Sequence, residues 1–257
     1  MQAYARDLAY IHDTGFTAFV RKAAPGLLRL LRRYGIHSGL VVDAGCGSGV
    51  WARELGGRGY EVLGIDISAA MIRLARRQAP AARFRIGSFL SADLPPCDAV
   101  TSIGEVVNYA FDRKSGKPGI AQFFRRVHDA LRPGGIFVFD IVEPGLVAGA
   151  TSERRFLEGP DWAILLEVRE DKRRKILTRQ IVSFRKVGQL YRRSEEIHRL
   201  HLYTRSELLE ELSRAGFEAR LLAGYGRFRF APAHAGFVAR KPREASFARQ
   251  GVRTTSA

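Results

Sequence analysis

Short apolar runs alternate with amphipathic stretches along the first 142 residues of the chain. The apolar runs have the length and composition of buried β-strands, and they lie at residues 40–43, 62–65, 83–86, 98–103 and 136–142. The amphipathic stretches repeat their apolar positions at helical spacing, and they lie at residues 2–12, 15–34, 50–55, 68–78 and 119–131. Strands that alternate with helices in this way predict a parallel, doubly wound α/β sheet.

Local signals mark where several of these elements begin and end. Gly15 separates the first two helices, and Pro25 is expected to start a new helical stretch and so to bend the second one. Ser68 is the expected N-cap of the fourth helix. The run Arg-Pro-Gly-Gly at residues 132–135 predicts a turn into the last apolar strand.

The pattern changes after about residue 150. Partly alternating, β-rich runs separated by charged or glycine-containing turns now follow, at residues 162–167, 176–184 and 190–201. They predict an antiparallel insertion over residues 151–203. Thr204 and Glu207 have the spacing of a capping box and open another helix. Two final strands are expected at residues 217–223 and 236–239.

These elements divide the chain into four parts. Residues 1–38 are expected to form an N-terminal helical lid, and a plain packing role for the first helix is the alternative. Residues 39–150 and 204–240 form the main α/β domain, and residues 151–203 form a cap inserted into it. From residue 241 to 257, polar and basic residues predict a disordered tail.

The chain of 257 residues carries a formal net charge of +16. Arginines make up 35 of the 42 basic residues, and they are spread over all the predicted helix surfaces. A nucleic-acid footprint needs cations clustered on one face, so we favour a compositional bias as the origin of the charge. A nucleic-acid partner is kept as the alternative.

The cellular location of the protein and the redox state of its compartment are predicted from two features that the sequence lacks, a membrane-spanning run and a cysteine pattern. No apolar run reaches the roughly 20 residues that cross a bilayer, so we expect a cytoplasmic protein with no membrane partner. Cys46 and Cys97 show neither a metal-ligand spacing nor a disulfide framework. We therefore expect a reducing compartment and no metal site.

Residues 39–67 contain the clearest chemical signal, a strand, a glycine loop, a helix and a second strand. Gly45, Gly47 and Gly49 follow Asp43 at the end of the first strand, and Asp66 ends the second strand. Glycines allow positive φ angles and bring bare N–H groups close to a ligand at a helix N-terminus. A carboxylate at the end of the second strand can accept hydrogen bonds from a ribose diol. This unit predicts a nucleotide site.

The glycine spacing argues against a redox dinucleotide. A nicotinamide or flavin fingerprint is G-x-G-x-x-G, whereas Val50 stands here where the third glycine should be. The set formed by Asp43, the glycine loop, Asp66 and residues 132–135 resembles the class I S-adenosylmethionine-dependent methyltransferases. The resemblance covers residues 39–142 well and the rest loosely. It implies a Rossmann-like, seven-stranded, mostly parallel sheet whose last strand is antiparallel.

The same resemblance implies roles for individual residues. Asp43 and the glycine loop would hold the amino-acid end of S-adenosyl-L-methionine, Asp66 the ribose hydroxyls, and Ile67 the adenine face. Many relatives have Asp where Ser88 stands, so only a hydroxyl or backbone groups would receive the adenine amino group here. The residues expected at the cofactor are Asp43, Gly45, Cys46, Gly47, Gly49, Asp66, Ile67, Met71, Ser88, Phe89, Ile103, Gly104, Tyr4 and Tyr10.

Methyl transfer is an in-line displacement that needs positioning and desolvation rather than a covalent enzyme intermediate. An acceptor hydroxyl would need a base, whereas an amine mainly needs to arrive neutral. Glu105, Tyr109 and His12 are the catalytic candidates. The weaker candidates are Tyr10, His198 and His201.

The histidines differ in where they are expected. His198 and His201 lie three apart on one predicted strand and therefore point to opposite faces, so only one of them can face the site. His37, His128 and His234 are interpreted as surface or packing residues.

The predicted cap gives an indication of the size of the methyl acceptor. Its aromatic residues either line an apolar wall or form its own core; they are Trp162, Phe184, Tyr191 and Tyr203. A cap over the site favours transfer to an N or O atom of a small molecule, because a polymer needs an open groove. Methylation of RNA or protein, and a non-catalytic cofactor-binding module, are the alternatives.

Overall fold

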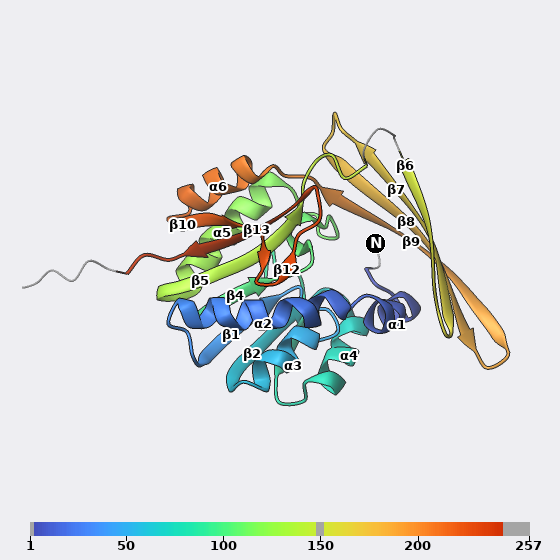
Figure 1. Cartoon of the computed structure of the whole chain (residues 1–257), viewed down its shortest axis with the longest axis horizontal. Coiled ribbons are helices and arrows are strands. Elements are labelled where there is room, and N and C mark those ends of the chain that lie inside the picture. Colours follow the sequence, from blue (N-terminus) through green and yellow to red (C-terminus); the bar gives the residue numbers. More distant parts are fainter. Residues whose placement is uncertain (1–2, 148–151, 244–257) are drawn as a thin grey trace, which may run out of the picture.

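The computed structural model describes residues 3–147 and 152–243. Its centre is a seven-stranded sheet with the strand order β10-β13-β5-β4-β1-β2-β3 (Figure 1). The strands are parallel except β13, which is antiparallel to both β5 and β10. The predicted fold is confirmed. The strands are β1 (Gly39–Ala44), β2 (Tyr60–Asp66), β3 (Arg83–Ile86), β4 (Cys97–Ser102), β5 (Leu131–Val142), β10 (Glu218–Leu222) and β13 (His234–Arg240).

Helices cover both faces of this sheet (Figure 1). Phe137 and Phe139 of β5 pack toward α5 and α6, whereas Val138 between them packs toward α2, α3 and α4. Because both faces are buried, the strands are apolar at nearly every position and appear in the sequence as continuous runs. The helices are α2 (Ala18–Arg33), α3 (Val50–Gly56), α4 (Ala69–Gln78), α5 (Lys117–Ala130) and α6 (Arg205–Arg214).

Both helix caps expected from the sequence are present. The Ser68 hydroxyl accepts a hydrogen bond from the amide of Met71 at the start of α4. At the start of α6, the Thr204 hydroxyl accepts from the amide of Glu207, and the Glu207 carboxylate accepts from the amide of Thr204. These bonds satisfy amides that a helix leaves free at its N-terminus.

The predicted new helix start at Pro25 is wrong, because α2 runs without interruption from Ala18 to Arg33. Proline removes one backbone hydrogen bond from a helix interior. Ala24, Leu27 and Leu28, around the proline, are buried in the core on this side of the sheet. This burial outweighs the local cost.

The insertion is a four-stranded antiparallel sheet, hereafter the cap sheet, which stands beside the main sheet (Figure 1). It consists of β6 (Ser152–Gly159), β7 (Trp162–Asp171), β8 (Ile176–Val187) and β9 (Leu190–His201). The sequence predicted only the last three. β6 is an edge strand whose first residues, Ser-Glu-Arg-Arg, are polar, so it lacks the apolar alternation by which a strand is recognised.

The first helix, α1 (Arg6–Gly15), lies between the cap sheet and the main domain (Figure 1). Its Asp7 carboxylate binds Arg185 at 3.1 Å and Arg192 at 2.6 Å on the cap sheet. Its Leu8 packs with Trp162 of the cap. α1 therefore holds the cap sheet through both charges and apolar contacts.

Two smaller differences from the sequence prediction concern turns, and one prediction about the chain end is not tested. Residues 132–135 are not a separate turn but the irregular start of β5, where the pairing with β4 shifts in register. A short hairpin formed by β11 (Gly224–Tyr225) and β12 (Phe228–Arg229) was not predicted. The predicted disordered tail lies, from residue 244 on, outside the described residues.

Within the part of the chain that the structure describes, no helix is long and apolar enough to span a membrane. Cys46 and Cys97 are both free and buried. Burial raises the pKa of the Cys97 thiol to about 12, so this thiol stays protonated.

Candidate active site

The glycine loop between β1 and α3 is fixed by backbone contacts. The amides of Gly45 and Cys46 donate to the carbonyl of Ile65 at the end of β2, at 2.7 and 3.1 Å. Gly47 has a φ angle of 52°, which glycine adopts at little cost. A Cβ at Gly47 would meet no atom within 4 Å, so the loop faces open space there.

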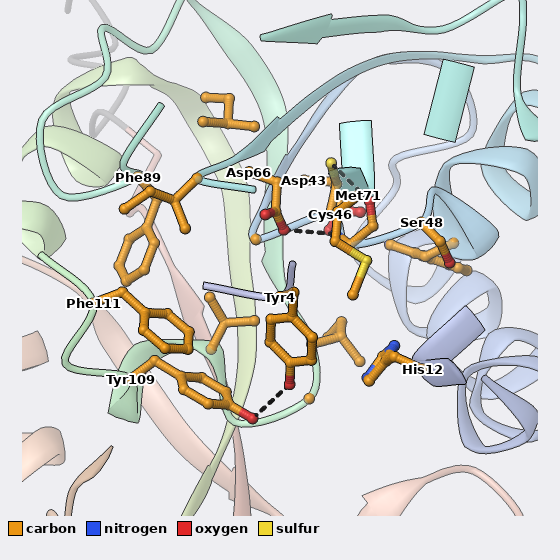
Figure 2. Close-up of a pocket in the computed structure, with 18 of the residues that line it drawn as sticks. Tyr4, His12, Asp43, Cys46, Ser48, Asp66, Met71, Phe89, Tyr109 and Phe111 are labelled. Carbon is orange, nitrogen blue, oxygen red and sulfur yellow. Dashed lines mark hydrogen bonds between the residues drawn. The ribbon is translucent and has the colours of Figure 1, made fainter. Parts of the chain in front are cut away.

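Asp66 lies opposite this loop with both carboxylate oxygens turned toward backbone amides. Oδ2 accepts from the amide of Gly47 at 2.9 Å (Figure 2), and Oδ1 accepts from the amide of Ser68 at 2.8 Å. Burial raises its pKa, although the bonds from Ser68 and Gly47 oppose this. Each oxygen has a further lone pair, so the carboxylate can also accept from the hydroxyls of a ligand.

Asp43 lies near the end of β1, beneath the loop, and is buried. Its Oδ1 accepts a hydrogen bond from the Thr101 hydroxyl at 2.9 Å. Burial raises the pKa of Asp43 to about 7, while the bond from Thr101 lowers it. A cationic ligand group nearby would favour the ionised form.

A first cavity lies over the loop, between the N-terminal residues and the segments that follow β3 and β4. It brings together twelve of the fourteen residues expected at a cofactor: Asp43, Gly45, Cys46, Gly47, Asp66, Ile67, Met71, Ser88, Phe89, Ile103, Gly104 and Tyr4. Phe89 and Ile67 supply apolar surface, and Asp66 supplies oxygen acceptors. This set fits the flat base and the diol of a nucleoside.

The other two expected residues, Gly49 and Tyr10, lie outside this cavity, so their assignment is corrected. Gly49 caps α3, and a Cβ there would overlap Ala75. Tyr10 faces the cap, where its hydroxyl donates to Asp161 at 2.8 Å and the Arg185 guanidinium lies over its ring. The sequence showed that α1 is polar and aromatic but not which face meets the site.

Asp112 lines the first cavity together with Gly87, Ser88 and Phe89, and the sequence analysis missed it. Its Oδ1 accepts from the amide of Lys114 at 2.8 Å. Burial opposes ionisation of Asp112, but this bond and the Ser88 hydroxyl lower its pKa. A carboxylate from the segment after β4 therefore lies beside Ser88, the position at which many class I methyltransferases have Asp.

Tyr4 closes the first cavity on the side of the cap (Figure 2). Its carbonyl accepts from the Ser68 hydroxyl at 2.8 Å, and its own hydroxyl lies 2.9 Å from that of Tyr109. Its φ angle of 45° is unusual for a bulky residue. These contacts hold the strained backbone in place.

A second cavity of about 420 Å³ lies between α1, the cap sheet and the segments after β4 and β5. Its apolar walls consist of Leu8, Phe16, Phe19, Leu146, Leu157, Ile164, Leu166, Val168, Ile181, Phe228 and Phe230. Both cavities are lined by Tyr4, His12, Phe19, Gly104 and Tyr109. We call these five residues the junction.

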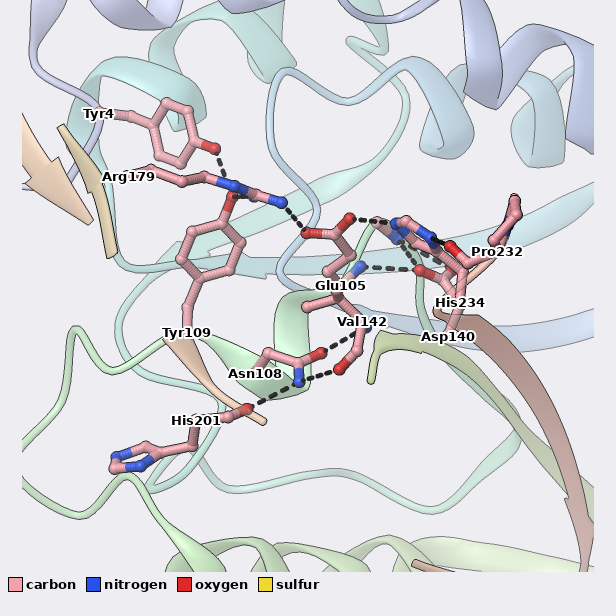
Figure 3. Close-up of polar contacts among 11 residues, drawn as sticks. Tyr4, Glu105, Asn108, Tyr109, Asp140, Val142, Arg179, His201, Pro232 and His234 are labelled. Atoms are coloured by element: carbon pink, nitrogen blue, oxygen red, sulfur yellow. Dashed lines mark hydrogen bonds and ion pairs between the residues drawn. The ribbon is translucent and has the colours of Figure 1, made fainter. Parts of the chain in front are cut away.

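Glu105 lines the second cavity but is not free to act as a base. Its Oε2 accepts from Arg179 at 2.7 Å, and its Oε1 binds His234 Nε2 at 2.9 Å (Figure 3). Burial opposes ionisation, but the charge of Arg179 and the contact with His234 outweigh it and lower the pKa of Glu105 to about 2. Such a carboxylate is too weakly basic to take a proton near neutral pH.

His234 was interpreted as a surface or packing residue, and this interpretation is wrong. Its Nδ1 lies 2.9 Å from the carbonyl of Pro232 and its Nε2 lies 2.9 Å from Glu105. Both partners only accept hydrogen bonds, so the ring satisfies both when it is doubly protonated. The contact with Glu105, opposed by burial, raises the pKa of His234.

Asp140 of β5 fixes the turn that carries Glu105. It accepts from the amides of Gly104 and Glu105 (Figure 3) and from the Tyr225 hydroxyl. Burial raises the pKa of Asp140 to about 6, and the bonds from Gly104, Glu105 and Tyr225 lower it. Glu105 itself has a φ angle of 61°, so this anchoring holds a strained backbone.

The junction contains Tyr109 and His12, both predicted as catalytic candidates. The Tyr109 hydroxyl accepts from Arg179 at 3.2 Å and contacts Tyr4. Burial lowers the pKa of His12 to about 4, so its ring is neutral near pH 7. Its Nδ1 is buried without a hydrogen-bond partner among the described residues. Arg179 was missed because it was one arginine among many in the sequence.

His198 and His201 point to opposite faces of β9, as predicted. His198 is 1% exposed and lines the second cavity. His201 faces away from it and lies 3.4 Å from the Ser115 hydroxyl. One histidine of the pair is therefore part of the cavity wall.

The aromatic cap residues named from the sequence do not line either cavity. Trp162 packs with Leu8 and Ile11 of α1, and Tyr203 belongs to the core under α5 and α6. Tyr191 is 59% exposed. The wall of the second cavity is instead mainly aliphatic on the cap side.

Comparison with known proteins matches residues 41–135 to the family described as a methyltransferase domain. Among curated proteins, the malonyl-[acyl-carrier protein] O-methyltransferase of Pectobacterium atrosepticum is 32% identical and covers 51% of this chain and 50% of its own. The dTDP-3-amino-3,6-dideoxy-alpha-D-glucopyranose N,N-dimethyltransferase of Streptomyces fradiae is 24% identical and covers 86% of this chain and 88% of its own.

Solved structures show the same fold over nearly the whole chain. The sugar N-methyltransferase KedS8 from Streptoalloteichus superposes with a TM-score of 0.74 and 21% identity, and covers 95% of each chain. The match to several of the curated relatives, by contrast, spans only about half of their length.

Proposed function

We propose that the chain is a class I S-adenosylmethionine-dependent methyltransferase and that it transfers a methyl group to the nitrogen of a small-molecule amine. The observation that carries this proposal is the junction, where a nucleoside-shaped cavity meets a second, cap-covered cavity. The five junction residues are the place where a methyl donor in one cavity would face an acceptor in the other.

The first cavity would hold S-adenosylmethionine. Asp66 would accept from the ribose hydroxyls, Ile67 and Phe89 would cover the adenine, and Asp43 would favour the cationic amino-acid end. Asp112 would accept from the adenine amino group in place of the Asp that is missing at position 88. The open space at Gly47 leaves room for this approach.

When bound, the cofactor supplies an electrophilic methyl carbon whose bond to sulfur breaks as the acceptor attacks from the opposite side. The chain's own residues would position the acceptor and exclude water. Tyr4 and α1 would act as a lid, because Tyr4 contacts Ser68 on the cofactor side and Tyr109 on the acceptor side.

An amine suits this site better than a hydroxyl. Attack by an alcohol oxygen requires removal of a proton by a group whose basicity matches the task. Glu105 and His12, with pKa values of about 2 and 4, are poor proton acceptors. A neutral amine has its own lone pair and needs no base at the moment of transfer.

The size and cover of the second cavity favour a small acceptor. A volume of about 420 Å³ is in the range of small-molecule sites. α1 and the cap sheet close two of its sides. RNA or a protein surface would need an open groove, so the second cavity supports the small-molecule alternative.

The relatives give independent support for nitrogen as the methylated atom. The Streptomyces fradiae enzyme, whose name specifies N,N-dimethylation of an amino sugar, aligns with 86% of this chain and so includes the cap. The O-methyltransferase from Pectobacterium aligns with only 51%. The acceptor half of the chain thus has its counterpart in a relative that methylates nitrogen.

The test is to incubate the purified protein with S-adenosylmethionine carrying an isotopically labelled methyl group and with a cell extract. Mass spectrometry should find the label in small molecules, on fragments that contain a methylated nitrogen. Label confined to RNA, protein or methoxy groups would overturn the proposal.

A further inference from the structure

The second cavity has two apolar walls, one from each part of the chain that encloses it. The main domain contributes three phenylalanines, Phe19 of α2, Phe228 of β12 and Phe230, which we call the aromatic wall. The Phe228 ring lies 6.2 Å from the ring of Phe19 and 6.0 Å from that of Phe230, so the three rings adjoin one another. The cap sheet contributes Leu157 of β6 and Leu166 of β7, which we call the leucine wall.

The side chains of both walls can be reached from the cavity. All five of them line it, and all five are only partly buried. Phe137 and Phe139, in the core of the main domain, are by contrast completely buried. A molecule in the second cavity would therefore cover apolar surface that is otherwise in contact with water, and this burial favours binding.

The polar side chains that line the second cavity bind mainly one another. Arg179 donates to Glu105 and to Tyr109. Arg155 donates to both carboxylate oxygens of Glu153, at 2.7 and 3.0 Å. A ligand rich in hydroxyl groups would have to displace these bonds or leave its own groups unpaired, and either costs binding free energy. The cavity therefore favours a ligand with few hydrogen-bonding groups.

The register of the cap sheet gives the direction in which such a ligand would lie. Arg155 of β6 pairs with Leu166 of β7, and Ile181 of β8 is the next partner of Leu166. β8 also carries Arg179, which contacts the junction at Tyr109. The Arg155 side chain lines the cavity and is 52% exposed, so the cavity opens to solvent at the edge strand β6. The leucine wall thus lies between the junction and this opening.

We propose that the acceptor is an amphipathic amine, whose nitrogen lies at the junction and whose apolar body lies between the aromatic wall and the leucine wall. This inference rests on the proposed function and narrows its class of acceptor. Polar groups at the far end of the acceptor would leave through the opening at β6. A bare amino sugar reaches the junction but leaves both walls uncovered, so it needs a much higher concentration for turnover.

The first experiment measures binding without turnover. The probes are the methyl, butyl and hexyl glycosides of 3-amino-3-deoxyglucose, which share one amine and differ only in apolar length. Each methylene that is fully buried raises affinity by about fourfold. In calorimetric titrations of the full-length protein saturated with S-adenosylhomocysteine, the hexyl glycoside should bind about 10²-fold more tightly than the methyl glycoside. Equal affinities would overturn the proposal.

The second experiment measures turnover of the same probes with S-adenosylmethionine. The walls hold the apolar body equally before and during methyl transfer, so the longer chain should lower KM and leave kcat nearly unchanged. The value of kcat/KM should therefore rise by about 10²-fold from the methyl to the hexyl glycoside. The same KM for both glycosides would contradict an apolar acceptor site.

Variants test whether the two walls are the place of binding. Leu157→Ala and Phe228→Ala each remove part of one wall, and each should reduce the preference for the hexyl over the methyl glycoside by about tenfold. Phe156→Ala and Leu165→Ala are the matched controls. They neighbour Leu157 and Leu166 on the same strands, point to the other face of the cap sheet and are 60% and 47% exposed.

The two controls should keep the preference of the wild type, and all four variants should bind S-adenosylhomocysteine within about twofold of the wild type, which excludes misfolding. An unchanged preference in Leu157→Ala and Phe228→Ala would overturn the proposal. Binding that depends on chain length, without turnover of any amine, would contradict the proposed function and still support the apolar ligand site. Turnover of all three glycosides with equal kcat/KM would support the proposed function and contradict this inference.

Discussion

The hydroxyl groups of Tyr4 and Tyr109 lie 2.9 Å apart, and this contact joins the N-terminal segment to the segment that follows β4. Arg179 of the cap sheet donates to Tyr109 at 3.2 Å, so three parts of the chain meet at one hydroxyl pair. Burial and the contact with Tyr109 raise the pKa of Tyr4 well above its usual value, so this phenol stays protonated near pH 7. The two hydroxyl groups therefore connect these three parts of the chain at the junction.

Removing the hydrogen bond between Tyr4 and Tyr109 should weaken the attachment of the N-terminal segment to the junction and leave the contacts to the cofactor in place. Tyr4→Phe should lower the free energy of unfolding by about 0.5–1.5 kcal/mol, the usual net value of one hydrogen bond. In a double-mutant cycle with Tyr109→Phe, measured by urea unfolding, the two losses should not add because both remove the same bond. Fully additive losses would show that the hydroxyls do not interact.

Asp66 should dominate cofactor affinity. Asp66→Ala removes the acceptor for the ribose hydroxyls, which should weaken binding of S-adenosylhomocysteine by about 1.5–3 kcal/mol in a calorimetric titration. Glu61→Ala is the matched control, because Glu61 lies on the same strand with an exposed side chain. Equal affinities of wild type and Asp66→Ala would remove Asp66 from the site.

Asp112 should decide which base is accepted. A carboxylate accepts from the 6-amino group of adenine, whereas an asparagine amide can also donate to a 6-oxo group. Asp112→Asn should therefore weaken binding of S-adenosylhomocysteine. The ratio of the affinities for S-adenosylhomocysteine and S-inosylhomocysteine should fall by about tenfold. If Asp112→Asn changes both affinities by the same factor, Asp112 does not contact the base edge.

The ion pair of Glu105 and His234 should make stability depend on pH in two windows. The pKa of Glu105 is lowered from 4.5 to about 2, so its contribution is present above pH 4.5 and is lost as the pH falls through about 2. The pKa of His234 is raised above 6.5, so its contribution is present below pH 6.5 and is lost as the pH rises through the raised value.

The measurement is the difference in unfolding free energy between the wild type and His234→Asn across pH 4 to 9. The difference should be largest between pH 4.5 and 6.5 and should fall on the alkaline side. His37→Asn, at a residue for which the sequence indicates a surface position, serves as the control and should show no such profile. A difference that grows as the pH rises above 7 would contradict the doubly protonated ring.

The main domain could be predicted from the sequence because its elements have strong local signals. The strands β1 and β2 are buried on both faces and so are continuous apolar runs, and Ser68 and Thr204 mark helix starts by chemistry that is confined to one turn. Pro25 failed as a signal because the burial of Leu27 and Leu28 is a tertiary effect.

The acceptor side could not be predicted in the same way. His234 and Glu105 are 129 residues apart, and Arg179 reaches Glu105 from another sheet. No local pattern distinguishes Arg179 from 34 other arginines. On the acceptor side, only the alternation of side chains along β9 could be used. It placed His198 and His201 on opposite faces of the strand, and His198 does line the second cavity.

The central claim is transfer of a methyl group from S-adenosylmethionine to the nitrogen of a small amine. It is tested most directly by measuring formation of S-adenosylhomocysteine with a pair of acceptors that differ in one functional group, 3-amino-3-deoxyglucose and glucose. We predict turnover with the amino sugar, an N-methylated product in equal amount, and no turnover with glucose. Turnover with glucose alone, or background rates with the amino sugar and every other amine tried, would contradict the account.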